Sequence, residues 1–328
     1  MKALVTGATG FIGSHVVDLL LKNNIEVKCN IRHTSNLRWL KDKPLETVIA
    51  SLNDKNSLIE AVKDVDYIYH IAGVTFAKKK EEFFKGNYEA TKNLLEVIEK
   101  YNPNIKRFLF VSSQTVSGPA KSLDEPKTED MTCNPITTYG KSKKAAEDEV
   151  LKYKDKFPIT IIRAPAVYGP RDTAIYSVFK TVKIGIGAVV GLRPKYLSLI
   201  HSEDLVRGIY QASIHNRTIG EIYFVSSEKF YTWDEIIPKI SKFLNKKFVL
   251  KIRLPHFIVL TTAAISEVIN QFTSKPSVFN YEKGIDFIQD YWICSTQKAV
   301  EHFNYRQKVD IDNGLQQTIQ WYKSNGWL

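Results

Sequence analysis

The first half of the chain alternates short runs of β-branched and aromatic residues with segments whose apolar residues recur every three to four positions. The short runs are typical of buried strands and cover Lys2–Thr6, Ile25–Ile31, Glu46–Ala50, Val65–Ile71, Lys106–Val111 and Ile159–Arg163. The periodic segments between them are typical of helices and include Phe11–Lys22, Ser57–Lys63, Glu81–Tyr101 and Tyr139–Lys156. This alternation predicts an α/β fold: a doubly wound parallel sheet, helices on both faces, and ligands at the carboxyl ends of the strands.

The pattern loosens after Gly169-Pro170. Helical segments then dominate, namely Trp233–Leu244, Pro255–Phe272 and Asn313–Leu328, with Pro194, Pro238, Pro255 and Pro276 between or within them. One strand candidate, Glu221–Val225, is placed to return to the first sheet. We therefore expect a first domain over residues 1–168, joined by residues 200–225, and a second, smaller, mostly helical domain over residues 169–328.

Length and composition agree with this division, and charge raises one further possibility. The chain has 328 residues, 44% hydrophobic and 25% charged, which is typical of two globular domains. The net charge of +11 suggests nucleic-acid binding. However, the lysines are scattered, and the one tight run, Lys78–Lys80, lies beside Glu81 and Glu82, as in a solvated helix start. We expect no nucleic-acid partner, although excess lysine can steer an anionic ligand.

Cysteines and apolar runs limit the location of the protein. Cys29, Cys133 and Cys294 are far apart, with no histidine at metal-ligand spacing, which predicts no metal and a reducing cytoplasmic compartment. The glycines after residue 6 interrupt the apolar start before a signal peptide forms. The longest apolar run, residues 257–265, is too short to span a bilayer, and we interpret it as a packed helix rather than a membrane-surface anchor.

A glycine-rich loop joins the first strand to the first helix. The segment Thr6–Gly13 reads TGATGFIG and places Thr9 between Gly7 and Gly10. Such glycines permit a tight turn and close backbone approach to a pyrophosphate, while the helix N-terminus supplies unpaired N–H groups. The loop therefore predicts dinucleotide binding by a Rossmann domain.

The end of the second strand indicates which dinucleotide binds. An NAD enzyme usually has a carboxylate there for the ribose 2′-hydroxyl, whereas residues 28–35 contain none. Arg32, helped by Ser35, could hold a 2′-phosphate instead, which favours NADP over NAD. The alternative is that Arg32 is simply a solvated side chain at a strand end.

Tyr139 and Lys143 stand four residues apart on one face of a predicted helix. A phenol with a pKa near 10 transfers protons at neutral pH only if its phenolate is stabilised, which an adjacent ammonium and a cationic nicotinamide could do. Ser113 ends the fifth strand and could donate to a substrate oxygen. The hydroxyls of Ser112 and Thr115 could equally well bind a ligand or form hydrogen bonds with nearby backbone groups.

These segments together resemble the extended short-chain dehydrogenase/reductases, also called the NAD-dependent epimerase/dehydratase family. The resemblance covers essentially the whole chain. It rests on the loop Thr6–Gly13, on Asp66–Gly73, on Asn87, Thr91 and Asn93, on Ser113, Tyr139 and Lys143, and on Arg163–Arg171 and Ile200–Leu205.

The resemblance implies a set of ligand contacts. It implies that Lys143 binds the nicotinamide ribose, that Asn87 supports the site, and that His70 and His201 pack rather than catalyse. The other implied contacts are Gly7, Gly10, Phe11, Ile12 and Gly13 at the pyrophosphate, Ala72 and Gly73 beside the cofactor, and Pro165 and Val167 near the carboxamide. The helices Glu81–Tyr101 and Tyr139–Lys156 form a homodimer interface in many relatives.

Two departures bear on the ligands. Relatives that act on nucleotide sugars carry an Arg-Asp pair where this chain has Leu197 and Ser198. The strand end Ile31-Arg32 resembles instead the dihydroflavonol reductase and 3β-hydroxysteroid dehydrogenase branches. Ser51 replaces a common aspartate at the adenine, although the neighbouring Leu52 fits.

The sequence therefore predicts an NAD(P)-dependent oxidoreductase that interconverts a secondary alcohol and a ketone of a small molecule, with Tyr139, Lys143 and Ser113 as catalytic residues. One alternative is a nucleotide-sugar epimerase or dehydratase that retains NAD through its cycle. A second is a non-catalytic NAD(P)-binding sensor.

Overall fold

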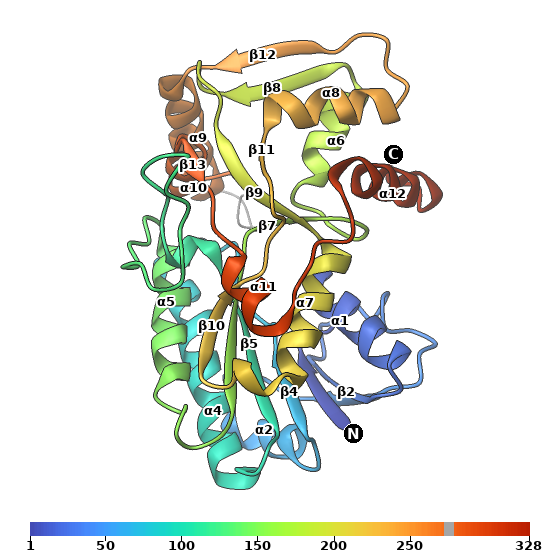
Figure 1. Cartoon of the computed structure of the whole chain (residues 1–328), viewed down its shortest axis with the longest axis vertical. Helices are drawn as coiled ribbons and strands as arrows, with labels where there is room; N and C mark the ends of the chain where they lie inside the picture. Colours follow the sequence, from blue (N-terminus) through green and yellow to red (C-terminus); the bar gives the residue numbers. More distant parts are fainter. Residues whose placement is uncertain (272–278) are drawn as a thin grey trace.

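The computed structural model describes residues 1–271 and 279–328 and contains a seven-stranded sheet in the order β10-β6-β5-β4-β1-β2-β3 (Figure 1). Every neighbouring pair in this sheet is parallel. The strands are β1 (Lys2–Thr6), β2 (Glu26–Ile31), β3 (Glu46–Ile49), β4 (Tyr67–His70), β5 (Arg107–Ser113), β6 (Ile159–Ala164) and β10 (Glu221–Phe224). The predicted parallel sheet is confirmed, and the late strand β10 joins it beside β6.

Helices cover both faces of the sheet. One face packs against α1 (Phe11–Lys22) and α7 (Ser202–Ile214), and the other against α2 (Lys55–Val62), α4 (Ala90–Tyr101) and α5 (Thr138–Leu151). The central strands are therefore buried on both sides, which explains why they read as continuous apolar runs rather than as alternating ones.

Two predicted helices differ from the observed ones. The segment Glu81–Tyr101 is not one α-helix but α3 (Lys80–Phe83), a π-helical segment at Phe84–Glu89, and α4. The wider π turn carries Asn87, whose side chain bonds to backbone outside the helix. Helix α5 ends at Leu151 instead of Lys156, and residues 152–156 form turns.

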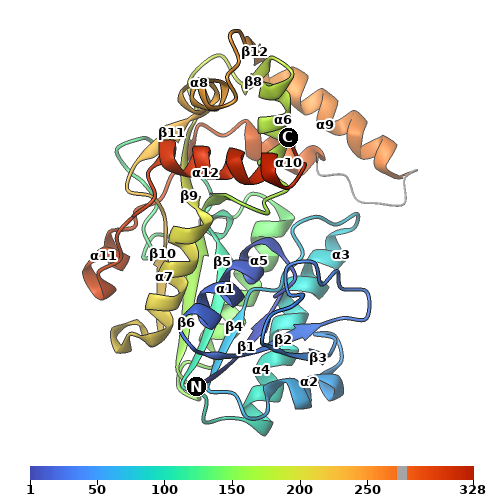
Figure 2. The ribbon, with the colours of Figure 1, turned by 90° about the vertical axis from the view of Figure 1, so that its right-hand side faces the viewer.

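The remaining elements form what we call the upper region, above the carboxyl ends of the main strands (Figure 2). Its helices are α6 (Tyr176–Lys183), α8 (Trp233–Phe243), α9 (His256–Gln271), α10 (Tyr281–Phe287) and α12 (Ile311–Ser324), while α11 (Gln297–Phe303) packs beside β10. Two small sheets, which the sequence pattern did not predict, lie among them: β7 (Ala166–Tyr168), β9 (Tyr196–His201), β11 (Phe230–Thr232) and β13 (Tyr291–Trp292) form one, and β8 (Ile186–Val190) and β12 (Leu250–Leu254) the other. Short helical turns lie at Gln114–Val116 and Asn216–Thr218.

Helix α9 corresponds to the predicted segment Pro255–Phe272, of which Phe272, like Pro276, lies outside the described residues. The prediction of a packed helix is right for only one of its faces. Val259 and Ala263 are buried, whereas Phe257 and Ile265 are 69% and 54% exposed. In the described part of the chain, no helix is long and apolar enough to cross a membrane.

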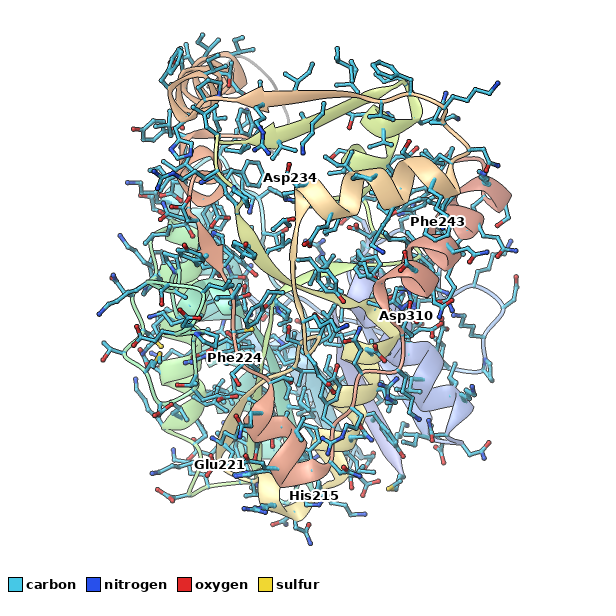
Figure 3. All side chains as sticks on the ribbon, turned by 45° about the horizontal axis from the view of Figure 1, so that its top comes forward. His215, Glu221, Phe224, Asp234, Phe243 and Asp310 are labelled. Carbon is cyan, nitrogen blue, oxygen red and sulfur yellow. The ribbon has the colours of Figure 1, made fainter. Side chains whose placement is uncertain are left out.

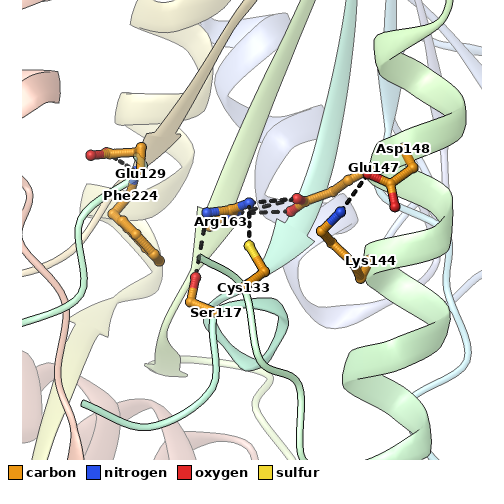
Figure 4. A network of polar contacts seen from close by, with 8 residues as sticks. All are labelled: Ser117, Glu129, Cys133, Lys144, Glu147, Asp148, Arg163 and Phe224. Carbon is orange, nitrogen blue, oxygen red and sulfur yellow. Dashed lines mark hydrogen bonds and ion pairs between the residues drawn. The ribbon is translucent and has the colours of Figure 1, made fainter. Parts of the chain in front are cut away.

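A buried ion pair joins β6 to α5 (Figure 4). Arg163 donates from Nε and Nη2 to the Glu147 carboxylate at 3.0 and 2.8 Å, and both side chains are almost fully buried. The same guanidinium reaches Ser117 Oγ at 3.4 Å and Cys133 Sγ at 3.2 Å. Because the contact is bidentate, it fixes the position of α5 along the strand as well as its distance from it.

We expect Glu147→Gln to lower the free energy of unfolding by about 3 kcal/mol, because it leaves the Arg163 charge buried without its counter-ion. Asp148→Asn is the matched control: one residue further on, it breaks an ion pair with Lys144 that is largely exposed, and should cost at most about 0.5 kcal/mol. Urea unfolding measures both variants. Equal losses would contradict a special role for the buried pair.

Candidate active site

The glycine-rich loop after β1 packs so closely against neighbouring backbone that it has no room for side chains at Gly7 and Gly13. Gly7 has φ +71°, and a Cβ there would lie 2.7 Å from the backbone N of Ala72. A Cβ at Gly13 would lie 2.1 Å from Gly7 O. Gly10 is the exposed N-cap of α1, and no side chain caps that helix. The loop thus fits a pyrophosphate, because backbone N–H groups at a helix N-terminus remain available to an anion.

Asn87 holds the loop that follows β4, where Ala72 and Gly73 lie. Its Oδ1 accepts from Val74 N at 2.7 Å, and its Nδ2 donates to Val74 O at 3.0 Å and to Ser142 Oγ at 2.9 Å. Both amide hydrogens are therefore used by protein atoms. Asn87, predicted among the cofactor-binding residues and as a support of the site, positions this loop against α5.

His70 and His201 are both buried, as the resemblance implies. His70 bridges Thr6 Oγ1 and Thr91 Oγ1, at 2.7 and 2.9 Å from its two ring nitrogens. The ring of His201 packs edge-on against Tyr168. Burial lowers the pKa of both histidines, to about 3 for His70 and about 4 for His201, so both are neutral at physiological pH.

Ser113, Tyr139 and Lys143 come together at the carboxyl edge of the sheet. The phenol of Tyr139 lies near Ser113, the last residue of β5, whose hydroxyl acts to lower the pKa of the phenol. Lys143, one turn further along α5, donates from Nζ to Val111 O at 2.8 Å and lies 4.0 Å from the centre of the Phe110 ring. Thr115, which the sequence left open, donates from Oγ1 to Ser113 Oγ at 2.9 Å and so orients that hydroxyl.

Burial dominates the acid–base chemistry of this trio. Desolvation raises the pKa of Tyr139, against the opposing effect of the Ser113 hydroxyl, and lowers that of Lys143 to about 7. The spacing of Tyr139 and Lys143 predicts that the Lys143 ammonium, together with a cationic nicotinamide, lowers the pKa of Tyr139. In the chain alone the shift has the opposite sign, because both groups lose water and the charged form of each is disfavoured.

The other predicted contacts also follow strand ends. Arg32 follows β2, and its side chain is exposed, while its backbone N donates to Ser35 Oγ at 2.9 Å and closes a turn. Leu52 follows β3 and is half-buried. Ser112 is buried, and among the described residues its hydroxyl has no partner. Pro165 follows β6, and Val167 lies on β7 opposite Ile200.

Two residues that the sequence analysis did not identify contact or face this site from α10. Glu282 accepts from Thr138 N at 2.8 Å and from Thr138 Oγ1 at 2.5 Å, and so holds the first residue of α5. The charge of Asp286 also raises the pKa of Tyr139. No sequence signal marks them, because more than a hundred residues separate α10 from α5 and neither carboxylate belongs to a motif.

A doubly wound sheet with an uncapped, glycine-lined helix N-terminus defines a Rossmann-type nucleotide-binding protein. The chain belongs to the NAD dependent epimerase/dehydratase family, whose model matches residues 3–226. This result confirms the family resemblance and the prediction of a nicotinamide dinucleotide cofactor.

Named relatives of the chain act on different molecules. It is 27% identical to a ceramide reductase of Caulobacter vibrioides, over 99% of this chain and 95% of the relative. It is 26% identical to a decarboxylating sterol-4-alpha-carboxylate 3-dehydrogenase of Dictyostelium discoideum, over 96% of this chain and 98% of the relative. Its fold matches the UDP-glucuronic acid 4-epimerase of Bacillus cereus, solved with UDP-glucuronic acid and NAD, with a TM-score of 0.78, 24% identity and coverage of 99% and 100%.

The pKa of Lys143 leads to a test by pH. Because folding lowers it from 10.5 to about 7, the unfolded chain binds more protons between these values, and the wild type gains stability as pH rises. We expect the free energy of unfolding of Lys143→Met, compared with that of the wild type, to be higher at about pH 7 than at about pH 10. Urea unfolding at the two values measures this difference. A difference that stays constant would show that Lys143 keeps an ordinary pKa.

Proposed function

We propose that the protein is an NAD(P)-dependent oxidoreductase that interconverts a secondary alcohol and a ketone. The observation that carries the proposal is the grouping of Tyr139, Ser113 and the buried Lys143 at the carboxyl edge of the sheet. A phenol aligned by a hydroxyl at the carboxyl edge of the sheet can exchange a proton with a substrate oxygen held there.

Each residue then has a separate role. Tyr139 gives its proton to the ketone oxygen in reduction and removes it from the alcohol in oxidation, and Ser113 hydrogen-bonds the same oxygen. Lys143 holds the nicotinamide ribose. When bound, the nicotinamide supplies or accepts the hydride. The residues proposed to bind the rest of the cofactor are Gly7, Thr9, Gly10, Phe11, Ile12, Gly13, Arg32, Ser35, Leu52, Ala72, Gly73, Ser112, Pro165 and Val167.

Tyr139→Phe removes the transferable proton and little else. We expect turnover to fall by at least about 100-fold, the usual contribution of a positioned acid or base, while cofactor affinity changes little. Tyr153→Phe, just beyond α5, is the control and should be nearly silent. Near-normal turnover of Tyr139→Phe would refute the assignment, and activity in neither the wild type nor the control would favour the non-catalytic sensor.

Arg32 is proposed to read the 2′-phosphate of NADP. Arg32→Ala should weaken NADPH binding by about 1.5–3 kcal/mol, the scale of a hydrogen bond to a charged group, and leave NADH binding nearly unchanged. Arg38→Ala, in the same exposed loop, controls for loss of positive charge. Fluorescence titration of both cofactors measures the effects. Equal losses for the two cofactors would contradict the proposal.

A nucleotide-sugar epimerase or dehydratase is the second candidate, supported by the fold match to the UDP-glucuronic acid epimerase. Three cations near Leu197 and Ser198 in sequence are candidates to replace the missing arginine: Arg193, which is exposed, and two that are already engaged in ion pairs. Arg171 pairs with Asp18 at 2.7 Å on α1, and Lys195 pairs with Asp290 at 2.7 Å. Ser198 uses its Oγ to accept from Cys294 N at 3.0 Å, and Leu197 packs into the core of the upper region.

We therefore expect UDP, UDP-glucose and dTDP-glucose to bind poorly to the cofactor-loaded protein, because these positions offer no bidentate arginine. Isothermal titration calorimetry measures the affinity directly. Binding in the micromolar range by any of the three would favour the epimerase or dehydratase instead. The absence of binding, together with NADPH consumption on hydrophobic ketones, would support the reductase.

A further inference from the structure

The outer face of α9 is apolar where a surface helix is normally polar. Phe257, Ile265, Val268 and Ile269 are between 54% and 69% exposed. The other exposed positions of the helix are His256, four uncharged residues (Ile258, Thr261, Thr262 and Ala264) and one carboxylate, Glu267, which accepts from Tyr281 N at 2.9 Å. A helix that packs one stripe against its own domain usually presents charged residues on the opposite side. This helix is apolar on both sides, so its outer face fits a nonpolar surrounding rather than water.

The apolar face continues onto the adjoining strands. A Cβ at Gly191 would lie 2.9 Å from His256 Nε2, so Leu192, which is 72% exposed, lies close to Phe257. Leu250 and Ile252 of β12 are exposed as well. Figures 1 and 2 both place β8, β12 and α9 at the end of the molecule opposite the N-terminus. The exposed apolar side chains of α9, Leu192 and β12 thus make up one region, which we call the apolar end.

The charges that border the apolar end are mostly positive. Residues 173–202 and 236–266, which supply β8, β12 and most of α9, contain lysine and arginine but no aspartate or glutamate. Lys183, Arg193, Lys246 and Lys247 are exposed there. Two further cations, Lys251 and Arg253, pair with Asp234 at the start of α8, which Figure 3 labels. The border therefore presents net positive charge around a centre that is apolar except for Glu267.

The apolar end lies one helix away from the candidate catalytic residues. Helix α10 packs against α9, since a Cβ at Gly284 would lie 2.9 Å from the Cβ of Ala263. The next contact inward is the pair of hydrogen bonds from Thr138 to Glu282, directly before Tyr139. The contacts therefore run from the apolar end through α10 to the residue next to Tyr139.

We propose that the apolar end docks on the surface of an anionic lipid bilayer, and that the substrate ketone or alcohol is a lipid taken from that bilayer. Apolar side chains that enter the interface, surrounded by basic ones that meet anionic head groups, form the pattern of a peripheral membrane-binding surface. A second copy of the chain fits less well, because a two-fold interface would bring two positively charged borders together. The substrate part of this inference rests on the proposed function, whereas the docking part does not.

Vesicle co-sedimentation tests the docking, using Tyr139→Phe protein so that catalysis plays no part. Vesicles contain phosphatidylcholine alone or with an equal part of phosphatidylglycerol. We expect at least about tenfold stronger binding to the anionic vesicles, since each lysine near such a surface contributes about 1 kcal/mol. Adding Phe257→Gln, Ile265→Gln and Val268→Gln should reduce that binding at least about tenfold.

Two further variants control this experiment. Ile49→Gln, Ile214→Gln and Ile219→Gln change three isoleucines that are equally exposed but lie outside the apolar end, and should leave vesicle binding unchanged. Lys246→Glu with Lys247→Glu should weaken binding to anionic vesicles but not to neutral ones. Circular dichroism establishes that each variant is folded.

Three results would overturn the docking: no vesicle binding by the parent protein, equal binding by the α9 variant and the isoleucine control, or a dimer that the α9 variant disperses while vesicle binding is absent.

The substrate is tested separately with otherwise wild-type protein. The α9 variant should lose at least about tenfold in NADPH oxidation on a long-chain ketone embedded in vesicles, yet retain its rate on a short soluble ketone. Equal losses on both would refute the lipid substrate, and inactivity of the wild type on every ketone would refute the proposed function while leaving the docking result intact.

Discussion

The ion pair between Arg163 and Glu147 fixes the position of the helix on which the proposed chemistry depends. Arg163 stands opposite Ser112 in the register of β5 and β6, one residue before the position opposite Ser113. Glu147 follows Lys143 by one helical turn, as Lys143 follows Tyr139, so the three share one helix face. The two buried charges of this pair therefore fix the helix face that carries Tyr139 relative to the strand end that carries Ser113.

The other polar contacts of the site act on the same helix. Asn87 joins the loop after β4 to Ser142, and Glu282 holds Thr138. Helix α5 is thus connected to β6, to the loop after β4 and to the upper region. A conformational change in any of these parts would be transmitted to the position of Tyr139, because the core between them is close-packed.

Burial has a second consequence, for the protons. Removing water raises the pKa of Tyr139 and lowers that of Lys143 to about 7, so the chain alone favours the neutral form of both groups. A cation brought in with a bound ligand would favour the phenolate. Proton transfer from Tyr139 is therefore expected to depend on the bound state of the site, rather than on a permanent shift in the free protein.

The sheet and its helices could be predicted because their signals are local. Short β-branched runs, the loop Thr6–Gly13 and the spacing of Tyr139 and Lys143 lie within a few residues each. The interruption at Phe84–Glu89 could not be predicted, since its cause is a bond from Asn87 to distant backbone. Neither could Glu282, whose partner is distant in sequence, nor the outward face of α9, because hydrophobicity alone does not tell which side of a helix is covered.

The central claim is that the chain catalyses a net oxidation or reduction, in which the cofactor binds and dissociates in each catalytic cycle. The most direct test is to denature the purified protein and to identify the nucleotide that is released. Our account predicts less than one equivalent of nucleotide per chain, and binding of added NADPH by the native protein. Release of one equivalent of NAD per chain, with no exchange against added NADPH, would contradict it and assign the chain to the epimerase or dehydratase alternative.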